Sequence, residues 1–413
     1  MNKIAGMIDA DKITFIRNKI RNICFYLGLL IEIGIVLWDK STFINPYEGR
    51  LFRVTFLLFG AALLMTHYSK KEWLTIVLFG ILGTVSYLVT GRNEILRIVV
   101  FLAACKDMNM KQVMKTLFWV TLAGGIVIVS ASLLGIFGET TVAQVYETSG
   151  VDVRYTLGFG HPNSLYCMAW ALMMLGMYMY PEKMKWYTYL LMMAGGIGLY
   201  LLTKTAMGLL IVTFTITAAM VFRYLPRIGR SRVVRYLSYA GVIFCFIISV
   251  LGAANAMLVS DYYWSRDFSA KARFYVWLDK FLTGRLQTLA CTVNAEGTLE
   301  TWRLFSTRQS TYYFDLGWVR LFYWYGIIPA VIFLLILLYL LYFCFKKQDD
   351  MAVVMILAIT VYTVMEAHFV SIYIARNYLL FLLGMYWYRM ISGTETQIAQ
   401  GNRKNGPLKI SEE

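Results

Sequence analysis

Charged residues are scarce in this chain. Only 15% of its 413 residues are Asp, Glu, Lys or Arg, while 59% are hydrophobic and the mean hydropathy is +0.59. An ordinary soluble domain carries roughly 25% charged residues, and its surface could not hide so many apolar side chains. The composition therefore excludes an ordinary soluble protein and indicates a membrane protein.

Paired cysteines outside the apolar stretches are also lacking. Five of the six cysteines fall within or beside apolar stretches, and only Cys291 lies in a polar segment. An external disulfide therefore has no pair of thiols to form it, and the spacing predicts no metal site. We expect neither a metal nor another cofactor.

No cleavable signal peptide precedes the first apolar stretch. Residues 1–22 alternate charges with isoleucines, which suits a cytoplasmic amphipathic helix lying on the inner leaflet. No repeat of 20 to 50 residues is visible, and no segment is large enough to fold as a soluble domain. We expect one membrane domain, 23–391, and a cytoplasmic tail, 392–413.

Apolar stretches long enough to cross about 30 Å of hydrocarbon recur along the whole chain. They predict an all-α polytopic membrane protein of about 12 transmembrane helices. The stretch 95–105 is the shortest and could equally be re-entrant. The predicted spans are 23–38, 51–66, 74–90, 95–105, 116–137, 164–180, 186–202, 206–222, 237–258, 318–345, 351–367 and 376–391.

Lys and Arg concentrate in every second break between these stretches and at both ends of the chain. Since short basic loops stay in the cytoplasm, we expect both termini inside and the loops 138–163 and 259–317 outside. The net charge of +15 then reflects attraction to anionic membrane lipid and requires no nucleic acid.

The long outward loop contains an apolar stripe at helical spacing, edged by cations seven residues apart. We expect an amphipathic helix at the outer membrane interface, although ordinary snorkelling of basic side chains would give the same pattern. The stripe comprises Phe274, Trp277, Leu278, Phe281 and Leu282, and the cations are Arg266, Arg273 and Lys280.

Many other cations are predicted to face outward, against the usual bias. Arg forks suit phosphate oxygens, so the pattern favours an anionic ligand such as a lipid-linked pyrophosphate. Lys204 stands between two apolar runs. A lone cation there is unfavourable unless it has a partner or lines a water-filled cavity, and the alternative is an ordinary turn between two helices at the outer surface. The outward set is Arg50, Arg53, Arg92, Arg97, Arg154, Lys204, Arg266, Lys271, Arg273, Lys280, Arg285, Arg303, Arg308, Arg320 and Arg376.

Three polar segments stand at predicted outer ends of spans. In 154–163 two glycines and Pro162 lead into a helix, with His161 at its N-terminus, where anions bind; an ordinary capped helix entry would look similar. Asp315 precedes the tenth span as a candidate general base or a helix cap. A possible second cluster, functional or merely structural, comprises Glu366, His368, Arg376 and Asn377.

In order, these segments resemble the O-antigen polymerase and ligase superfamily of bacterial surface-polysaccharide assembly. The resemblance covers most of the chain and includes the large loop before the tenth span. Lys204 departs from the Arg common in the family, and Asp315 stands where ligases often carry His. The segments are Arg154 with 157–163, Thr203-Lys204-Thr205, Arg273 with Trp277 and Gly284-Arg285, and Asp315-Leu316-Gly317-Trp318 followed by Tyr325-Gly326.

The resemblance implies a metal-independent glycosyltransferase of the bacterial cytoplasmic membrane, acting on its outer face. Its substrate would be an oligosaccharide linked to polyprenyl diphosphate, with membrane lipid, a flippase and a chain-length regulator as further partners. Asp315 and His161 would be catalytic, in that order of preference. The residues that would hold substrate and pyrophosphate are Arg154, Asn163, Lys204, Arg266, Arg273 and Arg285.

Asp315 in place of His favours a polymerase of capsular, exopolysaccharide or O-antigen repeat units. A ligase that moves the glycan to another acceptor remains open. So does a flippase of the same lipid-linked unit, although few charges fall in mid-span, Glu32 being one.

Overall fold

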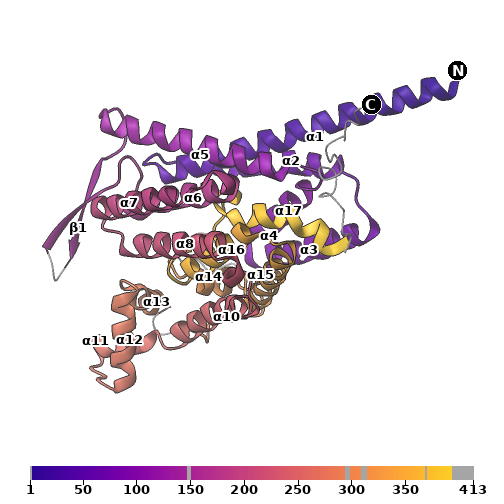
Figure 1. The fold of residues 1–413 in the computed structure, drawn as a ribbon. Coiled ribbons are helices and arrows are strands. Elements are labelled where there is room, and N and C mark those ends of the chain that lie inside the picture. The colour runs from indigo at the N-terminus through magenta and orange to yellow at the C-terminus, as the bar shows by residue number, and fades with distance from the viewer. Residues whose placement is uncertain (1, 147–149, 294–297, 308–313, 368–369, 393–413) are drawn as a thin grey trace, which may run out of the picture.

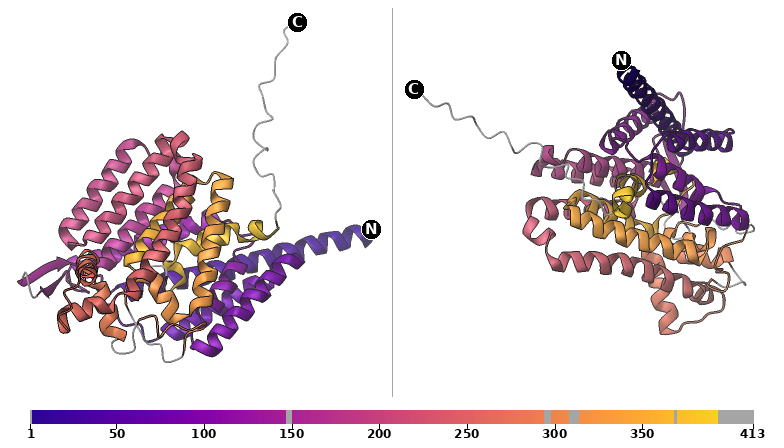
Figure 2. Two further views of the ribbon diagram at one scale, coloured as in Figure 1. Left: turned by 90° about the horizontal axis from the view of Figure 1, so that it is seen from below. Right: turned by 90° about the vertical axis from the view of Figure 1, so that its right-hand side faces the viewer.

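The computed structural model describes residues 2–146, 150–293, 298–307, 314–367 and 370–392. Long helices run back and forth as a bundle, so that successive helices point in opposite directions (Figures 1 and 2). They are α1 (Asn2–Lys40), α2 (Glu48–Leu64), α3 (Lys70–Thr90), α4 (Glu94–Ala104), α5 (Met110–Leu133), α6 (Pro162–Met179), α7 (Trp186–Thr203), α8 (Ala206–Tyr224), α10 (Arg232–Ala254), α15 (Ile327–Lys347), α16 (Asp350–Met365) and α17 (Tyr378–Ser392).

Short elements join the long helices. They are β1 (Thr141–Tyr146), β2 (Gly150–Tyr155), η1 (Pro181–Lys183), α9 (Pro226–Gly229), α11 (Met257–Trp264), α12 (Ala270–Phe281), α13 (Arg285–Val293), α14 (Gly317–Trp324) and η3 (Ile374–Arg376).

The described residues contain seven helices that are long and apolar enough to cross a membrane. This finding agrees with an all-α membrane protein, whereas the predicted number of about 12 spans is not confirmed. Helix α4, at 11 residues, is about 16 Å long and too short to cross alone. The seven are Lys12–Lys40, Lys70–Thr90, Met110–Leu133, Trp186–Thr203, Ala206–Tyr224, Arg232–Trp264 and Ile327–Lys347.

The predicted span 318–345 is not one continuous helix. It breaks into α14 and α15 at Gly326, whose φ of 103° is a conformation that side chains rarely adopt. A Cβ at this position would lie 2.5 Å from the carbonyl oxygen of Leu304, so only glycine fits. The break could not be predicted from hydropathy, because the residues on both sides of Gly326 are apolar.

The loop 138–163, which was predicted to face outward, contains two strands. Strands β1 and β2 form an antiparallel hairpin that pairs Val142 with Arg154 and projects beyond the bundle (Figure 1). Val145, Val151 and Val153 give these segments the β-branched content of a strand, a signal that could have predicted the hairpin.

Helix α16 forms part of the interior of the bundle, because most of its side chains are buried against α6, α8, α10 and α15. Helices α3 and α7, by contrast, expose many Leu, Ile and Val side chains on their outer faces. A helix that shows apolar side chains to its surroundings suits a hydrocarbon environment. The arrangement therefore has the inside-out polarity of a membrane bundle.

Helix α12 confirms the predicted amphipathic helix in the long loop, with two corrections. Phe274, Trp277 and Phe281 form an exposed row, whereas Leu278 is partly buried and Leu282 is buried just beyond the helix. Arg266 lies before α12 rather than along it, so of the three predicted cations only Arg273 and Lys280 belong to the helix. The stripe is thus divided between an outer aromatic row and an inner leucine pair.

Residues 2–22 are helical, but they do not form a separate helix. Helix α1 runs without interruption from Asn2 into the first predicted span and protrudes from the bundle (Figure 1). The predicted tail contributes Ser392 to the end of α17, and 393–413 lie outside the described residues.

Candidate functional site

Polar side chains from distant parts of the chain meet at one end of the bundle. The end of α1, the start of α6, the turn between α7 and α8, the start of α13 and the loop after α16 all converge there. We call this the polar cluster and define it as Asp39, Lys40, Arg154, His161, Asn163, Thr205, Arg285, Asp315, Glu366 and Arg376.

A chain of hydrogen bonds crosses the polar cluster. Arg285 forms a buried ion pair with Glu366, and Asn163 donates its side-chain amide to the same carboxylate oxygen at 3.2 Å. Thr205 in turn donates its hydroxyl to the amide oxygen of Asn163 at 3.1 Å. Four segments that are far apart in sequence are thereby tied together around one carboxylate.

The guanidinium of Arg285 is mostly engaged by the protein. Besides Glu366, it donates to the backbone oxygen of Leu282 at 2.8 Å and to the hydroxyl of Thr283. Its Nε is buried and has no hydrogen-bond partner among the described residues. Arg285 therefore organises the cluster and is not the open phosphate fork expected from the sequence.

His161 caps the N-terminus of α6, and Pro162 occupies the first turn, as the sequence predicts. The imidazole Nδ1 accepts the backbone N–H of Asn163 at 3.1 Å. Burial lowers the pKa of His161, Asp315 opposes this shift, and Arg154 together with other cations adds to it. Because Nδ1 accepts this hydrogen bond, the neutral ring carries its proton on Nε2, and Nε2–H is the group of the ring that can donate a further hydrogen bond.

Asp315 lies close enough to His161 and Glu366 to interact with both electrostatically. Its carboxylate is half exposed, and the nearest guanidinium nitrogen of Arg320 is 3.9 Å away. Arg320 is itself buried and donates to the backbone oxygen of Phe314 at 2.8 Å. Arg320 therefore fixes the loop that carries Asp315, and Asp315 is the accessible carboxylate of this group.

The end of α1 supplies two residues, Asp39 and Lys40, that were not predicted from sequence. Lys40 pairs with Asp39 at 2.8 Å, and Tyr373 donates its hydroxyl to Asp39 at 2.7 Å. The backbone oxygen of Lys40 accepts the N–H of Gly160 at 3.0 Å, which joins α1 to the segment before α6. Lys40 also interacts electrostatically with Arg376. No local pattern marks their role, because the residues that they contact in other elements, Gly160, Tyr373 and Arg376, are more than a hundred positions away.

Lys204 ends α7 in the left-handed conformation, with φ of 52°, and its side chain is exposed. It adjoins Thr205, so it lies at the edge of the polar cluster. Arg154 is on β2, which packs against α7, and it interacts electrostatically with His161. The structure therefore places both predicted cations at the same end of the bundle.

Two predicted cations lie elsewhere. Arg266 and Arg273 are exposed on the hairpin of α11 and α12, and no described contact joins them to the polar cluster.

Arg97, another of the cations predicted to face outward, is buried between the helices and pairs with Glu32, so it is not a candidate to bind a ligand. His368 lies outside the described residues.

An apolar groove of about 540 Å³ is lined in part by chain neighbours of the polar cluster. We call it the α10 groove. It follows α10 from Val234 to Gly252, a distance of about 27 Å at 1.5 Å per residue. Leu286, Leu316 and Met365 line it, and each adjoins a charged member of the cluster: Arg285, Asp315 and Glu366.

The arrangement suits a ligand that is polar at one end and apolar along the rest. The groove would bury a hydrocarbon chain, while Arg154, Arg376 and the Nε2–H of His161 would contact an anionic head. No group of three or more His, Cys, Asp or Glu capable of holding a metal occurs in the described part of the chain. Comparison with protein-family models, with curated proteins and with solved structures gave no match.

Proposed function

We propose that this protein is a glycosyltransferase that joins oligosaccharide units carried on polyprenyl diphosphate into a longer polysaccharide. The observation that carries the proposal is that three residues lining the α10 groove, Leu286, Leu316 and Met365, directly follow or precede Arg285, Asp315 and Glu366 of the polar cluster in the chain. A polyprenyl chain matches the groove, and a diphosphate matches the cations at its end. The family resemblance of the sequence segments supports the same class of substrate.

The proposed reaction makes one bond and breaks one bond. A hydroxyl oxygen of the acceptor sugar attacks the anomeric carbon of the donor, and the bond from that carbon to the diphosphate oxygen breaks. Polyprenyl diphosphate leaves with the bonding electrons, so its negative charge grows in the transition state. Arg154, Arg376, Lys204 and the Nε2–H of His161 would stabilise that charge more than the ground state.

The hydroxyl proton requires an acceptor. Asp315 is the candidate, because its carboxylate is half exposed, whereas Glu366 is committed to Arg285 and Asn163. His161 uses its Nδ1 lone pair on the backbone of Asn163 and is left with a donor. Asp315 would therefore act as the base, and His161 would donate a hydrogen bond to the diphosphate.

The proposed topology completes this function. About 12 membrane-crossing segments, both termini in the cytoplasm and an outward polar cluster would put the reaction on the outer face of a bacterial cytoplasmic membrane. The basic breaks between the helices support this orientation. A flippase would then deliver the lipid-linked units, and a chain-length regulator would limit the product.

The test is reconstitution of the full chain with lipid-linked repeat units, followed by separation of the products by length. We expect a ladder of lengths from the wild type, and we expect Asp315→Asn to reduce its rate by about 100-fold or more, the usual contribution of a general base. Arg376→Ala should reduce it by a similar factor. Arg53→Ala, an exposed cation of α2, is the control and should leave the ladder intact.

Other products would change the proposal. A single added block on a different acceptor would identify a ligase, and lipid-linked units moved across the membrane without new glycosidic bonds would identify a flippase. If Asp315→Asn and Arg376→Ala, tested as single variants, both gave a full ladder, the assigned site would be refuted.

A further inference from the structure

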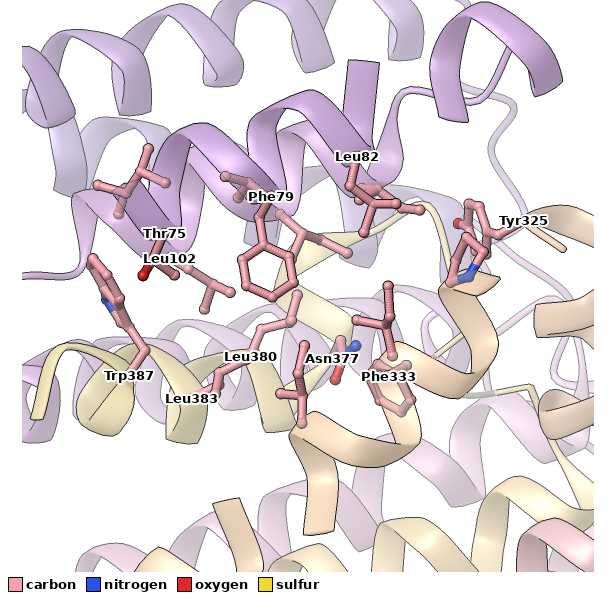
Figure 3. A pocket seen from close by; sticks show the side chains of 18 of the residues that line it. Thr75, Phe79, Leu82, Leu102, Tyr325, Phe333, Asn377, Leu380, Leu383 and Trp387 are labelled. Carbon is pink, nitrogen blue, oxygen red and sulfur yellow. The ribbon is translucent and has the colours of Figure 1, made fainter. Parts of the chain in front are cut away.

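A second apolar groove lies on the other side of the bundle. It has a volume of about 320 Å³ and runs between α3 and α4 on one side and α15 and α17 on the other (Figure 3). We call it the α4 groove. From Leu380 to Ile391 it follows α17 for about 16 Å at 1.5 Å per residue. Phe79 and Phe333 reach into it from opposite walls, and Trp387 marks one end (Figure 3).

The α4 groove and the polar cluster share a wall. Asn377 presents its side chain to the groove (Figure 3), while its neighbour Arg376 interacts electrostatically with Lys40 and Glu366. One peptide bond therefore separates a groove residue from a cluster residue. The backbone N–H of Asn377 donates to Ile374 at 3.0 Å, and Arg97 donates to the backbone oxygen of Ile372 at 2.9 Å, so this wall is firmly held.

The two grooves also flank one short element. Leu316, just before α14, lines the α10 groove, and Leu321 within α14 lines the α4 groove. Asp315 precedes both of these residues in the chain. A chain of hydrocarbon in each groove would thus bring its head group toward the same polar cluster from a different side.

We propose that the α4 groove holds the polyprenyl chain of the acceptor unit, while the α10 groove holds that of the donor. The inference rests on the proposed function, which requires two lipid-linked units at one reaction centre. The chemistry of the occupant is the same in both grooves, a long isoprenoid hydrocarbon ending in a diphosphate. One groove holds one polyprenyl chain, so a second groove is needed to bring the hydroxyl of the acceptor unit to the cluster beside the anomeric carbon of the donor unit.

The probe is a polyprenyl diphosphate that carries a photoreactive benzophenone on its terminal isoprene unit. The full chain in lipid nanodiscs is irradiated with the probe, and the modified peptides are identified by mass spectrometry. We expect adducts on α4 or α17 and, separately, on α10 or α16.

Variants that fill one groove separate the two sites. Val99→Trp places a large side chain in the α4 groove and should lower its adducts by tenfold or more, while the α10 adducts persist and show that the variant is folded. Gly241→Trp should do the reverse, since a Cβ there meets open space in the α10 groove. Gly80→Trp on α3, also in open space but not lining either groove, should change neither.

The outcomes distinguish this inference from the proposed function. Adducts confined to the α10 groove would overturn the inference and leave the donor site of the proposed function standing. Displacement of the α4 adducts by an equal concentration of phosphatidylglycerol would assign that groove to ordinary membrane lipid and overturn the inference too. Adducts in neither groove would overturn both.

Discussion

Arg97 is a residue for which the sequence-based prediction and the structure differ. It appears as one of many outward cations, yet its guanidinium is buried and donates to Glu32 at 2.9 Å, while Thr55 donates to the same carboxylate oxygen at 2.6 Å. The guanidinium also stacks over Phe52, 3.7 Å from the ring centre. These contacts join α1, α2 and α4, so the charge of Arg97 serves the fold rather than a ligand.

Removal of one partner of this pair should destabilise the protein strongly. We expect Arg97→Met to lower the free energy of unfolding by about 3 to 5 kcal/mol, because the Glu32 carboxylate is left buried without its cation. The measurement is unfolding of the purified protein by SDS titration. Arg53→Met, on the exposed face of α2, is the control. A double variant that adds Glu32→Gln should recover part of the loss, and equal stability of Arg97→Met and Arg53→Met would contradict this account.

At the scale of elements, the hairpin of α11 and α12 is built to present an aromatic surface. Asp279 anchors its inner side by accepting the backbone N–H groups of Leu286 and Gln287 at 2.7 and 3.1 Å. Its outer side exposes Phe274, Trp277 and Phe281 as a row of neighbouring rings. Aromatic rings flanked by Lys and Arg are typical of the boundary between lipid and water.

Fluorescence quenching can locate this surface. In vesicles of lipids brominated near the head group, we expect tryptophan emission to be partly quenched and the quenched fraction to fall in Trp277→Phe. Trp302→Phe is the control, since Trp302 stacks on Phe322 with ring centres 4.0 Å apart inside the protein. If Trp277→Phe left the quenched fraction unchanged, α12 would not lie at the membrane surface.

At the scale of the whole molecule, the alternating helices bring every loop of the polar cluster to one end and the basic breaks to the other (Figures 1 and 2). This separation is what the orientation rule requires of a membrane protein whose site faces outward. The exposed Cys291 on α13 lies on the side proposed to be outside. It offers a natural marker of topology.

A membrane-impermeant maleimide should label Cys291 in intact cells, and Cys291→Ser should abolish that labelling. In the Cys291→Ser background, Lys71→Cys, an exposed position near the start of α3, should be labelled only after the membrane is permeabilised. Labelling is read by a mass shift of the purified protein. The opposite pattern would invert the proposed topology and place the cluster in the cytoplasm.

The class of fold and the rough positions of most helices could be predicted from sequence, because the length of an apolar run and the placement of Lys and Arg act locally. The sequence also predicted His161 at the N-terminus of a helix and an amphipathic helix where α12 lies, since both are local patterns. It could not anticipate the break at Gly326, because the constraint there is the approach of Leu304 from another part of the chain.

The tertiary structure alone decided which charges meet. Arg97 and Arg285 look alike in sequence, but one is paired with Glu32 and the other with Glu366, positions separated by 65 and 81 residues. Lys40 and Asp39 join the polar cluster for the same reason, through contacts with Gly160 and Tyr373. The two grooves likewise depend on side chains from several helices. Such long-range contacts are set by how the helices pack, and packing has no local signature in the sequence.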